Sequence, residues 1–193
     1  MAYQPTQRDR YLIRYDDTEP AQRQAYRGQA ADRLRVFAAE NKIGASGDPG
    51  EYIVKDWQPL LDALPAVIPL NRWQTAPLAV VGTYYSVFQN QATIAVRNNQ
   101  AVAVYSVSVL DPAFPVSRFR IQEGVAGAGT YGDFDLQQME ANLEPTGYLS
   151  EPAIFGPMRI MNLTVCSKVA TGVVANVVLG MLVVEMFGVT ITI

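Results

Sequence analysis

The sequence predicts a mainly β protein: a single jelly roll or β-sandwich with an N-terminal extended and helical arm and one short inserted helix. Three observations predict it. The last two thirds of the chain contain about eight short runs rich in β-branched and aromatic residues, Pro, Gly and Asn residues separate these runs, and one helical stripe lies near the N-terminus. With 193 residues, 49% of them hydrophobic, the chain has enough apolar side chains for a sizeable core.

The uneven distribution of charge predicts two parts. Residues 1–55 hold nine basic and eight acidic side chains, whereas the remaining 138 residues hold six and ten. We therefore predict an N-terminal arm over 1–55 and a β-sandwich or jelly-roll domain over 56–193.

The arm is predicted to contain one amphipathic helix over about residues 19–43. Thr18, Glu19 and Pro20 supply a capping hydroxyl, an acid and a proline in the order that begins helices. Gly44 follows the last turn and is typical of a helix end. Four apolar residues at spacings of four, four and three share one face. They are Tyr26, Ala30, Leu34 and Phe37.

Strands are predicted in the β domain wherever apolar residues alternate or run together. Residues 116–122 alternate Phe119 and Ile121 with polar side chains, and 159–169 alternates in the same way. Asn98 and Asn99 tolerate the positive φ of a tight turn and predict a hairpin between two strands. The other expected strands are 66–70, 78–89, 93–97, 101–109, 173–179 and 181–193.

Two short helices are expected among the strands. Leu136, Met139 and Leu143 share one face of a segment over 135–143, and a second helix fits between the prolines of 57–65.

The apolar C-terminal segment is long enough to cross a bilayer, but its pattern favours strands. Residues 173–193 contain Glu185 near the middle, at a cost of roughly 2.5 kcal/mol or more in a membrane span. Gly180 and Gly188 divide the segment into pieces of strand length. We therefore predict two buried strands.

The residue inventory argues against an enzyme and against a cofactor. The chain has no histidine, and its one cysteine, Cys166, lies in a strand-like run where we expect it to be buried. Residues 127–132 match G-x-G-x-x-G, but the acids that follow disfavour a pyrophosphate, so a flexible glycine loop is expected. Among those acids, Asp133 and Asp135 are the candidates for a cation site, with helix capping as the simpler explanation.

The organisation resembles that of small single-jelly-roll capsid proteins of icosahedral viruses and phages, including those whose shells enclose a membrane. The features that carry the resemblance are the arm at 1–55, the hairpin around Asn98 and Asn99, and the strand-rich end at 158–193. It implies self-assembly, arms exchanged between subunits, a place in the virion and no catalysis. The acids of the arm nearly cancel its bases, unlike the strongly basic arms of capsids that package naked genomes.

The predicted function is therefore that of a virion structural protein, a capsid, coat or cement subunit that self-assembles through its β domain and arm. The expected partners are copies of itself and other virion proteins, and contact with an internal membrane remains open. A net charge of −3 argues against nucleic-acid binding through a positive field, and we expect no sequence-specific nucleic-acid partner. Candidate assembly contacts are Tyr11, Arg14, Tyr26, Leu34 and Phe37.

The alternative is a non-enzymatic binding module, a lectin-like or receptor-binding β-sandwich. Tyrosines placed on an exposed face would then recognise the ligand together with the loop at 123–135. These tyrosines are Tyr84, Tyr85, Tyr131 and Tyr148.

Overall fold

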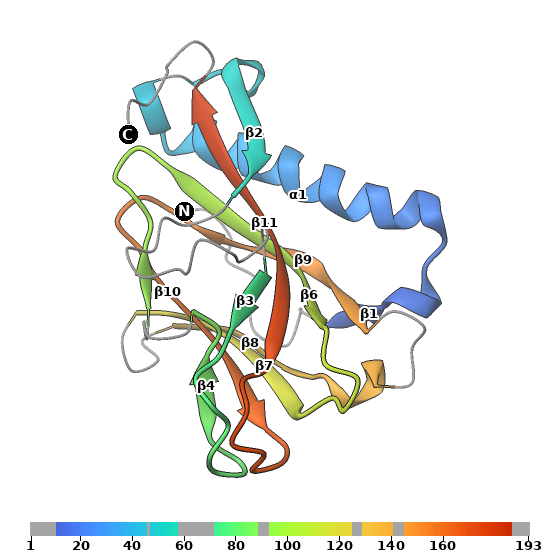
Figure 1. Cartoon of the computed structure of the whole chain (residues 1–193). Helices are drawn as coiled ribbons and strands as arrows, with labels where there is room; N and C mark the ends of the chain where they lie inside the picture. The colour runs from blue at the N-terminus through green and yellow to red at the C-terminus, as the bar shows by residue number, and fades with distance from the viewer. Residues whose placement is uncertain are drawn as a thin grey trace.

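Two antiparallel sheets pack face to face, and helix α1 (Pro20–Glu40) lies across the outer face of the larger sheet (Figure 1). The computed structural model describes residues 11–45, 47–57, 72–88, 93–124, 129–140 and 145–186. The predicted β-sandwich with an N-terminal helix is confirmed.

The larger sheet has the strand order β1–β9–β6–β11–β2, and β3 also pairs with β11. Its strands are β1 (Leu12–Arg14), β2 (Tyr52–Asp56), β3 (Arg72–Gln74), β6 (Ala101–Val109), β9 (Thr146–Phe155) and β11 (Asn176–Met186).

The smaller sheet has the order β4–β10–β7–β8, and β5 also pairs with β10. Its strands are β4 (Tyr84–Ser86), β5 (Ile94–Ala95), β7 (Val116–Glu123), β8 (Gly129–Asp135) and β10 (Ile160–Ser167). Single 3₁₀ turns lie at Tyr15–Asp17, Ile43–Ala45, Pro49–Glu51 and Gln137–Met139.

Strands β2 and β3 lie in line along one side of β11. Strand β2 pairs with residues 182–186 of β11, and β3 pairs with residues 176–178. Between them the Trp57 amide donates to the Met181 carbonyl at 3.0 Å. Trp57 therefore continues the line of β2 along β11 in the direction of β3. The helix predicted within 57–65 and the strand predicted at 66–70 lie almost wholly outside the described residues.

Strand β6 supplies side chains to both faces of the larger sheet. Val102 and Val104 point into the core between the sheets, whereas Ala101 and Ala103 pack with α1. Opposite β11 the pairing of β6 passes from Val104 to Ser106 and leaves Tyr105 as an extra residue, whereas opposite β9 the register passes from Ala153 to Tyr148. This bulge shifts the alternation by one position, so the valines at 107 and 109 again point into the core.

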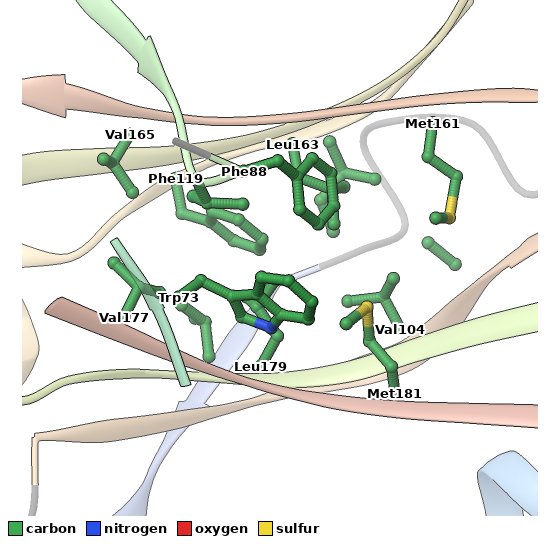
Figure 2. Packing of buried hydrophobic residues seen from close by; sticks show 14 of the residues in the cluster. Trp73, Phe88, Val104, Phe119, Met161, Leu163, Val165, Val177, Leu179 and Met181 are labelled. Atoms are coloured by element: carbon green, nitrogen blue, oxygen red, sulfur yellow. The ribbon is translucent and has the colours of Figure 1, made fainter. Parts of the chain in front are cut away.

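The core between the sheets is built from side chains of both layers (Figure 2). The rings of Trp73 and Phe88 meet edge to face, with centroids 5.4 Å apart. The alternation predicted for β7 and β10 is confirmed, because Phe119, Ile121 and Leu163 are buried there. Cys166 on β10 is buried, as expected.

Helix α1 buries a small-residue face against the larger sheet. Ala30, Leu34 and Ala38 pack with alanines of β6 and with Leu182 of β11. The predicted start of the helix is correct to within one residue, but the cap differs. Glu19 is the cap residue and forms a capping box with Gln22, whereas the hydroxyl of Thr18 donates to the Tyr15 carbonyl.

The segment 1–55 contributes to the sandwich itself. Strand β2 spans the predicted boundary at residue 55 and pairs with β11. Arg27 of α1 pairs with Asp56 of β2 at 3.2 Å, and Arg33 pairs with Glu151 of β9 at 2.9 Å. From α1 onward, this segment therefore folds on the chain's own sheet.

The hairpin predicted around Asn98 and Asn99 is wrong. The turn itself forms, since the Gln100 amide donates to the Arg97 carbonyl at 3.2 Å. However, β5 before the turn belongs to the smaller sheet, and β6 after it belongs to the larger sheet. A local turn signal does not distinguish a hairpin from a crossing between two sheets, because the same turn can join strands that pair with each other or strands that pair with distant partners.

The prediction that Gly180 separates two C-terminal strands is also wrong. Strand β11 continues through Gly180, where a Cβ would meet the Ser106 hydroxyl and the Tyr105 ring. The glycine allows a close approach of β6 and does not interrupt the strand. Within the described part of the chain, no helix is long and apolar enough to cross a membrane. Residues 187–193 lie outside that part.

Two of the predicted elements are shorter in the structure. Among residues 78–88, only Tyr84–Ser86 forms a strand, because the preceding residues form a loop that bonds to residues 167–175. The helix predicted at 135–143 is one 3₁₀ turn, Gln137–Met139, beside which Leu136 and Met139 are buried. Leu143 lies outside the described residues.

Candidate functional site

The outer face of the smaller sheet carries a polar network centred on Asp133 of β8. Its carboxylate accepts hydrogen bonds from Tyr84 Oη at 2.8 Å and from Arg118 Nε at 2.9 Å. Arg120 donates to it from Nη2 at 2.7 Å and from Nε at 3.0 Å. The Arg120 guanidinium also lies over the Tyr84 ring, 3.5 Å from its centroid.

The strand registers place these groups together. Arg120 of β7 lies opposite Asp133 of β8, and Tyr84 of β4 lies opposite Cys166 of β10. Because Phe119 on β7 and Phe134 on β8 point into the core, their neighbours Arg120 and Asp133 point outward. The network therefore joins three strands of one sheet across its outer surface.

The electrostatics of the network keep both acidic groups in their ordinary states at neutral pH. Burial by itself would raise the pKa of Asp133, but hydrogen bonds from Arg120, Tyr84 and Arg118 outweigh it and lower that pKa. Burial, followed by the hydrogen bond to Asp133, raises the pKa of Tyr84. Asp133 is thus ionised and Tyr84 protonated, which suits a fixed charge network better than proton transfer.

The two candidate cation ligands, Asp133 and Asp135, are held by other partners. Asp133 already accepts four hydrogen bonds, as many as a carboxylate has lone-pair positions. Asp135 accepts a hydrogen bond from the Gln137 amide at 2.8 Å and so caps the 3₁₀ turn. In the ranges that the structure describes, no group of three His, Cys, Asp or Glu side chains is arranged to hold a metal ion.

The glycine-rich motif at 127–132 enters strand β8. Residues 129–132 lie within the strand, whereas 127 and 128 lie outside the described residues. A Cβ on Gly132 would collide with the Phe134 ring. This glycine therefore makes room for an aromatic side chain of the same strand, and the described part of the predicted loop, residues 129–132, is strand.

The candidate assembly residues lie in different environments. Tyr11 is 62% exposed, and Arg14 forms an ion pair with Asp17 at 2.7 Å. Leu34 of α1 is fully buried between the helix and the larger sheet, and the Phe37 ring lies against Gly156. The remaining candidate, Tyr26, stacks on Tyr148 with centroids 5.1 Å apart. Of the five, Tyr11 and Arg14 lie ahead of α1.

The four tyrosines of the predicted recognition face do not share an exposed surface, so that prediction is wrong. Tyr131 is buried and donates to the Ile154 carbonyl at 2.9 Å. The Tyr85 hydroxyl accepts the amide of Val80, and Tyr84 lies beneath Arg120. Tyr148 is stacked on the helix. Sequence alternation alone does not show which face of a strand is covered by another element.

Two surface features escaped the sequence analysis. One is a shallow cleft of about 380 Å³ beside the start of β10, where Arg159 pairs with Glu123 at 2.7 Å. The other is a group of exposed valines in two loops at the opposite end of β10. Residues 75–83 contain no charged side chain, and this is the sequence feature from which the exposed valines could have been predicted.

A comparison of the sequence with protein-family models and with curated proteins finds no match.

Proposed function

We propose that this chain is a virion structural protein, a capsid, coat or cement subunit that self-assembles through a jelly-roll domain and the segment ahead of α1. The observation that carries the proposal is the pairing pattern of the strands. This pattern fits a jelly roll, an architecture that serves in viral shells and also in lectins and cupins.

The pattern is clear when two strands that pair in line with the same neighbour are counted as one. Strands β2 and β3 form the first, because both pair with β11, and β4 and β5 form the second, because both pair with β10. Strands β6 to β11 are then the third to the eighth.

With this count, the first strand pairs with the eighth and the second with the seventh. The third pairs with the sixth, β6 with β9, and the fourth pairs with the fifth, β7 with β8. An antiparallel ribbon that folds over on itself generates these four pairings. They support a jelly roll over other sandwich topologies.

The charge chemistry of the surface supports assembly. Only 17% of residues are charged, and several charged side chains already have partners within the chain. Protein interfaces are depleted of charged residues at their centres, since an unpaired charge costs free energy when it is buried. A surface with few free charges can therefore be covered by other subunits.

Light scattering against concentration and negative-stain electron microscopy of the full chain test the proposal. We expect defined oligomers or closed particles of uniform size above a threshold concentration. A stable monomer at about 1 mM, well above the dissociation constants of specific assemblies, would contradict it.

A deletion of residues 1–18 tests the contribution of the N-terminal segment. A longer deletion to residue 55 would remove β2 and uncover the face beneath α1, so its result would report misfolding. The shorter deletion keeps β2 and α1 but removes the edge strand β1, whose Leu12 packs against the core, and Tyr15 beneath Arg23. We expect it to weaken assembly and to lower the melting temperature while the domain still folds. Unchanged assembly would exclude a role for this segment and leave the rest of the proposal standing.

A further inference from the structure

Two loops at one end of the sandwich lie side by side, and each carries exposed valines. One loop, residues 75–83, joins β3 to β4, and the other, residues 168–175, joins β10 to β11 (Figure 1). The valines are between 40% and 59% exposed. We call this surface the valine platform, and it consists of Val80, Val81, Val169 and Val173.

The platform is rigid because backbone hydrogen bonds join its two loops. The Leu78 amide donates to the Val173 carbonyl at 2.9 Å, and the Gly172 amide donates to the Leu78 carbonyl at 3.0 Å. The Gly82 amide donates to the Ser167 carbonyl at 2.9 Å. Leu78 itself is fully buried and anchors the first loop in the core.

This rigidity lowers the cost of using the platform as a contact. The loops are ordered before any partner binds, and a valine has one side-chain torsion to restrict. The entropy lost on association is therefore small. An exposed apolar group held in this way is typical of an interaction surface.

The platform carries no net charge. Residues 75–83 contain no charged side chain, and 168–175 contain only Lys168, which pairs with Glu140 at 2.7 Å. The amides of Ala79 and Val80 donate to the Tyr85 hydroxyl at 3.0 and 2.9 Å. The surface thus favours an apolar, uncharged partner over an acidic, basic or strongly polar one.

A second copy of the chain offers such a partner. Two neutral platforms meet without the repulsion that like charges would cause in a contact between identical surfaces. A bilayer fits less well, because membrane-binding tips combine apolar residues with interfacial aromatic and basic side chains. Here the Tyr85 hydroxyl is bonded to the loop backbone and Lys168 is paired with Glu140.

We propose that copies of this chain meet platform to platform around a rotation axis of the assembly. The inference deepens the proposed function and rests on it, since it names the surface through which the subunits associate. The contact buries valines against valines and involves neither the helix-covered face nor the charged face of the sandwich.

The double variant V81K/V173K tests the inference against the control M158K. Met158 is 71% exposed and lies beside the start of β10, at the other end of that strand from the platform. The control thus adds a positive charge at an exposed apolar side chain away from the proposed contact. A second variant, V81S/V173S, removes the apolar surface without adding charge. Circular dichroism and thermal melts establish that each variant folds.

We expect V81K/V173K to raise the concentration of half-association about tenfold or more, as measured by light scattering, because lysine would be desolvated in the contact. V81S/V173S should raise it less, and M158K should leave it unchanged. Association of both platform variants at the wild-type concentration would overturn the inference while the proposed function stands.

Two further outcomes would also overturn the inference. Weakening by M158K equal to that by V81K/V173K would show that added charge acts without regard to position. A wild-type chain that remains monomeric at about 1 mM would overturn both the inference and the proposed function. If that monomer sediments with vesicles of phosphatidylcholine and phosphatidylglycerol, and V81K/V173K does not, the platform is a membrane contact.

Discussion

The two outer faces of the sandwich are finished in different ways. The larger sheet presents small apolar residues, Ala101 and Ala103 among them, and the chain covers them with its own helix α1. The smaller sheet presents Arg118, Arg120 and Asp133, whose hydrogen bonds satisfy one another at the surface. The apolar face of the larger sheet depends on α1 to shield it from water, whereas the polar side chains of the smaller sheet pair with one another.

The helix-covered face and the charged face therefore contribute differently to stability and to assembly. Removal of α1 would uncover an apolar face, so the helix is a structural layer of the domain. The charged face is stabilised by pairing and is costly to bury against an apolar partner. Four exposed valines lie in the loops at one end of the sandwich.

The largest expected effect is at the helix-covered face. Replacement of Leu34, fully buried between α1 and the sheet, by alanine should lower the free energy of unfolding by about 2–5 kcal/mol, because it leaves a cavity. Urea denaturation measures this. The exposed neighbour Val36 is the control, and V36A should cost less than about 0.5 kcal/mol. Equal losses from the two variants would show that α1 does not form a tightly packed layer.

Two glycines, Gly180 of β11 and Gly28 of α1, differ in the space beside their missing side chains. Gly180→Ala should cost about 1–3 kcal/mol, because its Cβ would meet Ser106 and the Tyr105 ring. Gly28 lies within α1 with nothing near its missing Cβ, so Gly28→Ala should stabilise by about 0.5–1 kcal/mol. Melting temperatures should therefore move in opposite directions. A stable Gly180→Ala variant would mean that β6 and β11 have room to separate.

The charged face predicts a pH-dependent effect. Asp133→Asn should cost about 1–3 kcal/mol at pH 7, because Arg118 and Arg120 lose their shared counter-charge. Since the pKa of Asp133 is lowered by folding, its stabilising contribution is complete above its ordinary value of 3.8 and is lost as pH falls through the lowered value.

The free energies of unfolding of the wild type and of Asp133→Asn should therefore converge in acid. Urea titrations at pH 7 and near pH 2.5 measure this convergence. Asp32→Asn, at an exposed carboxylate paired with Arg35, is the control and should change stability by less than about 0.5 kcal/mol. A constant difference between wild type and Asp133→Asn across this pH range would show that the carboxylate does not act through its charge.

The smallest effect is expected at the rim between helix and sheet. Tyr26 of α1 stacks on Tyr148 of β9 at an interplanar angle of 16°. A double-mutant cycle with leucine at both positions should give a coupling free energy of about 0.5–1.5 kcal/mol. Additive effects of the two substitutions would show that the stack contributes only buried area.

The elements that the sequence predicts well are those whose pattern is local. Strands β7 and β10 alternate cleanly, and their inward residues Phe119, Ile121 and Leu163 are all in the core. The beginning of α1 follows from Glu19 and Pro20, because helix caps involve only neighbouring residues. Cys166 is buried in the strand-like run where burial was predicted.

The misassigned elements depend on contacts between distant residues. Asn98 and Asn99 form a turn, but whether it closes a hairpin depends on whether β5 pairs with β6 or with β10. In the sequence, Gly180 has the pattern of a strand end. In the structure, Tyr105 of β6 occupies the space where a side chain at this position would lie. Asp133 is one of several neighbouring acids in the sequence, and only the registers of β4, β7 and β8 show its three partners.

The sequence by itself determined the mainly β class, the N-terminal helix and the inward residues of the regular strands, because periodicity and capping are properties of neighbouring residues. The tertiary structure alone decided the strand pairing, the covering of one sheet by α1, the Asp133 network and the joining of two loops into the valine platform. Each of these brings together residues far apart in the chain, and the free energy that selects them comes from packing and pairing that no local pattern encodes.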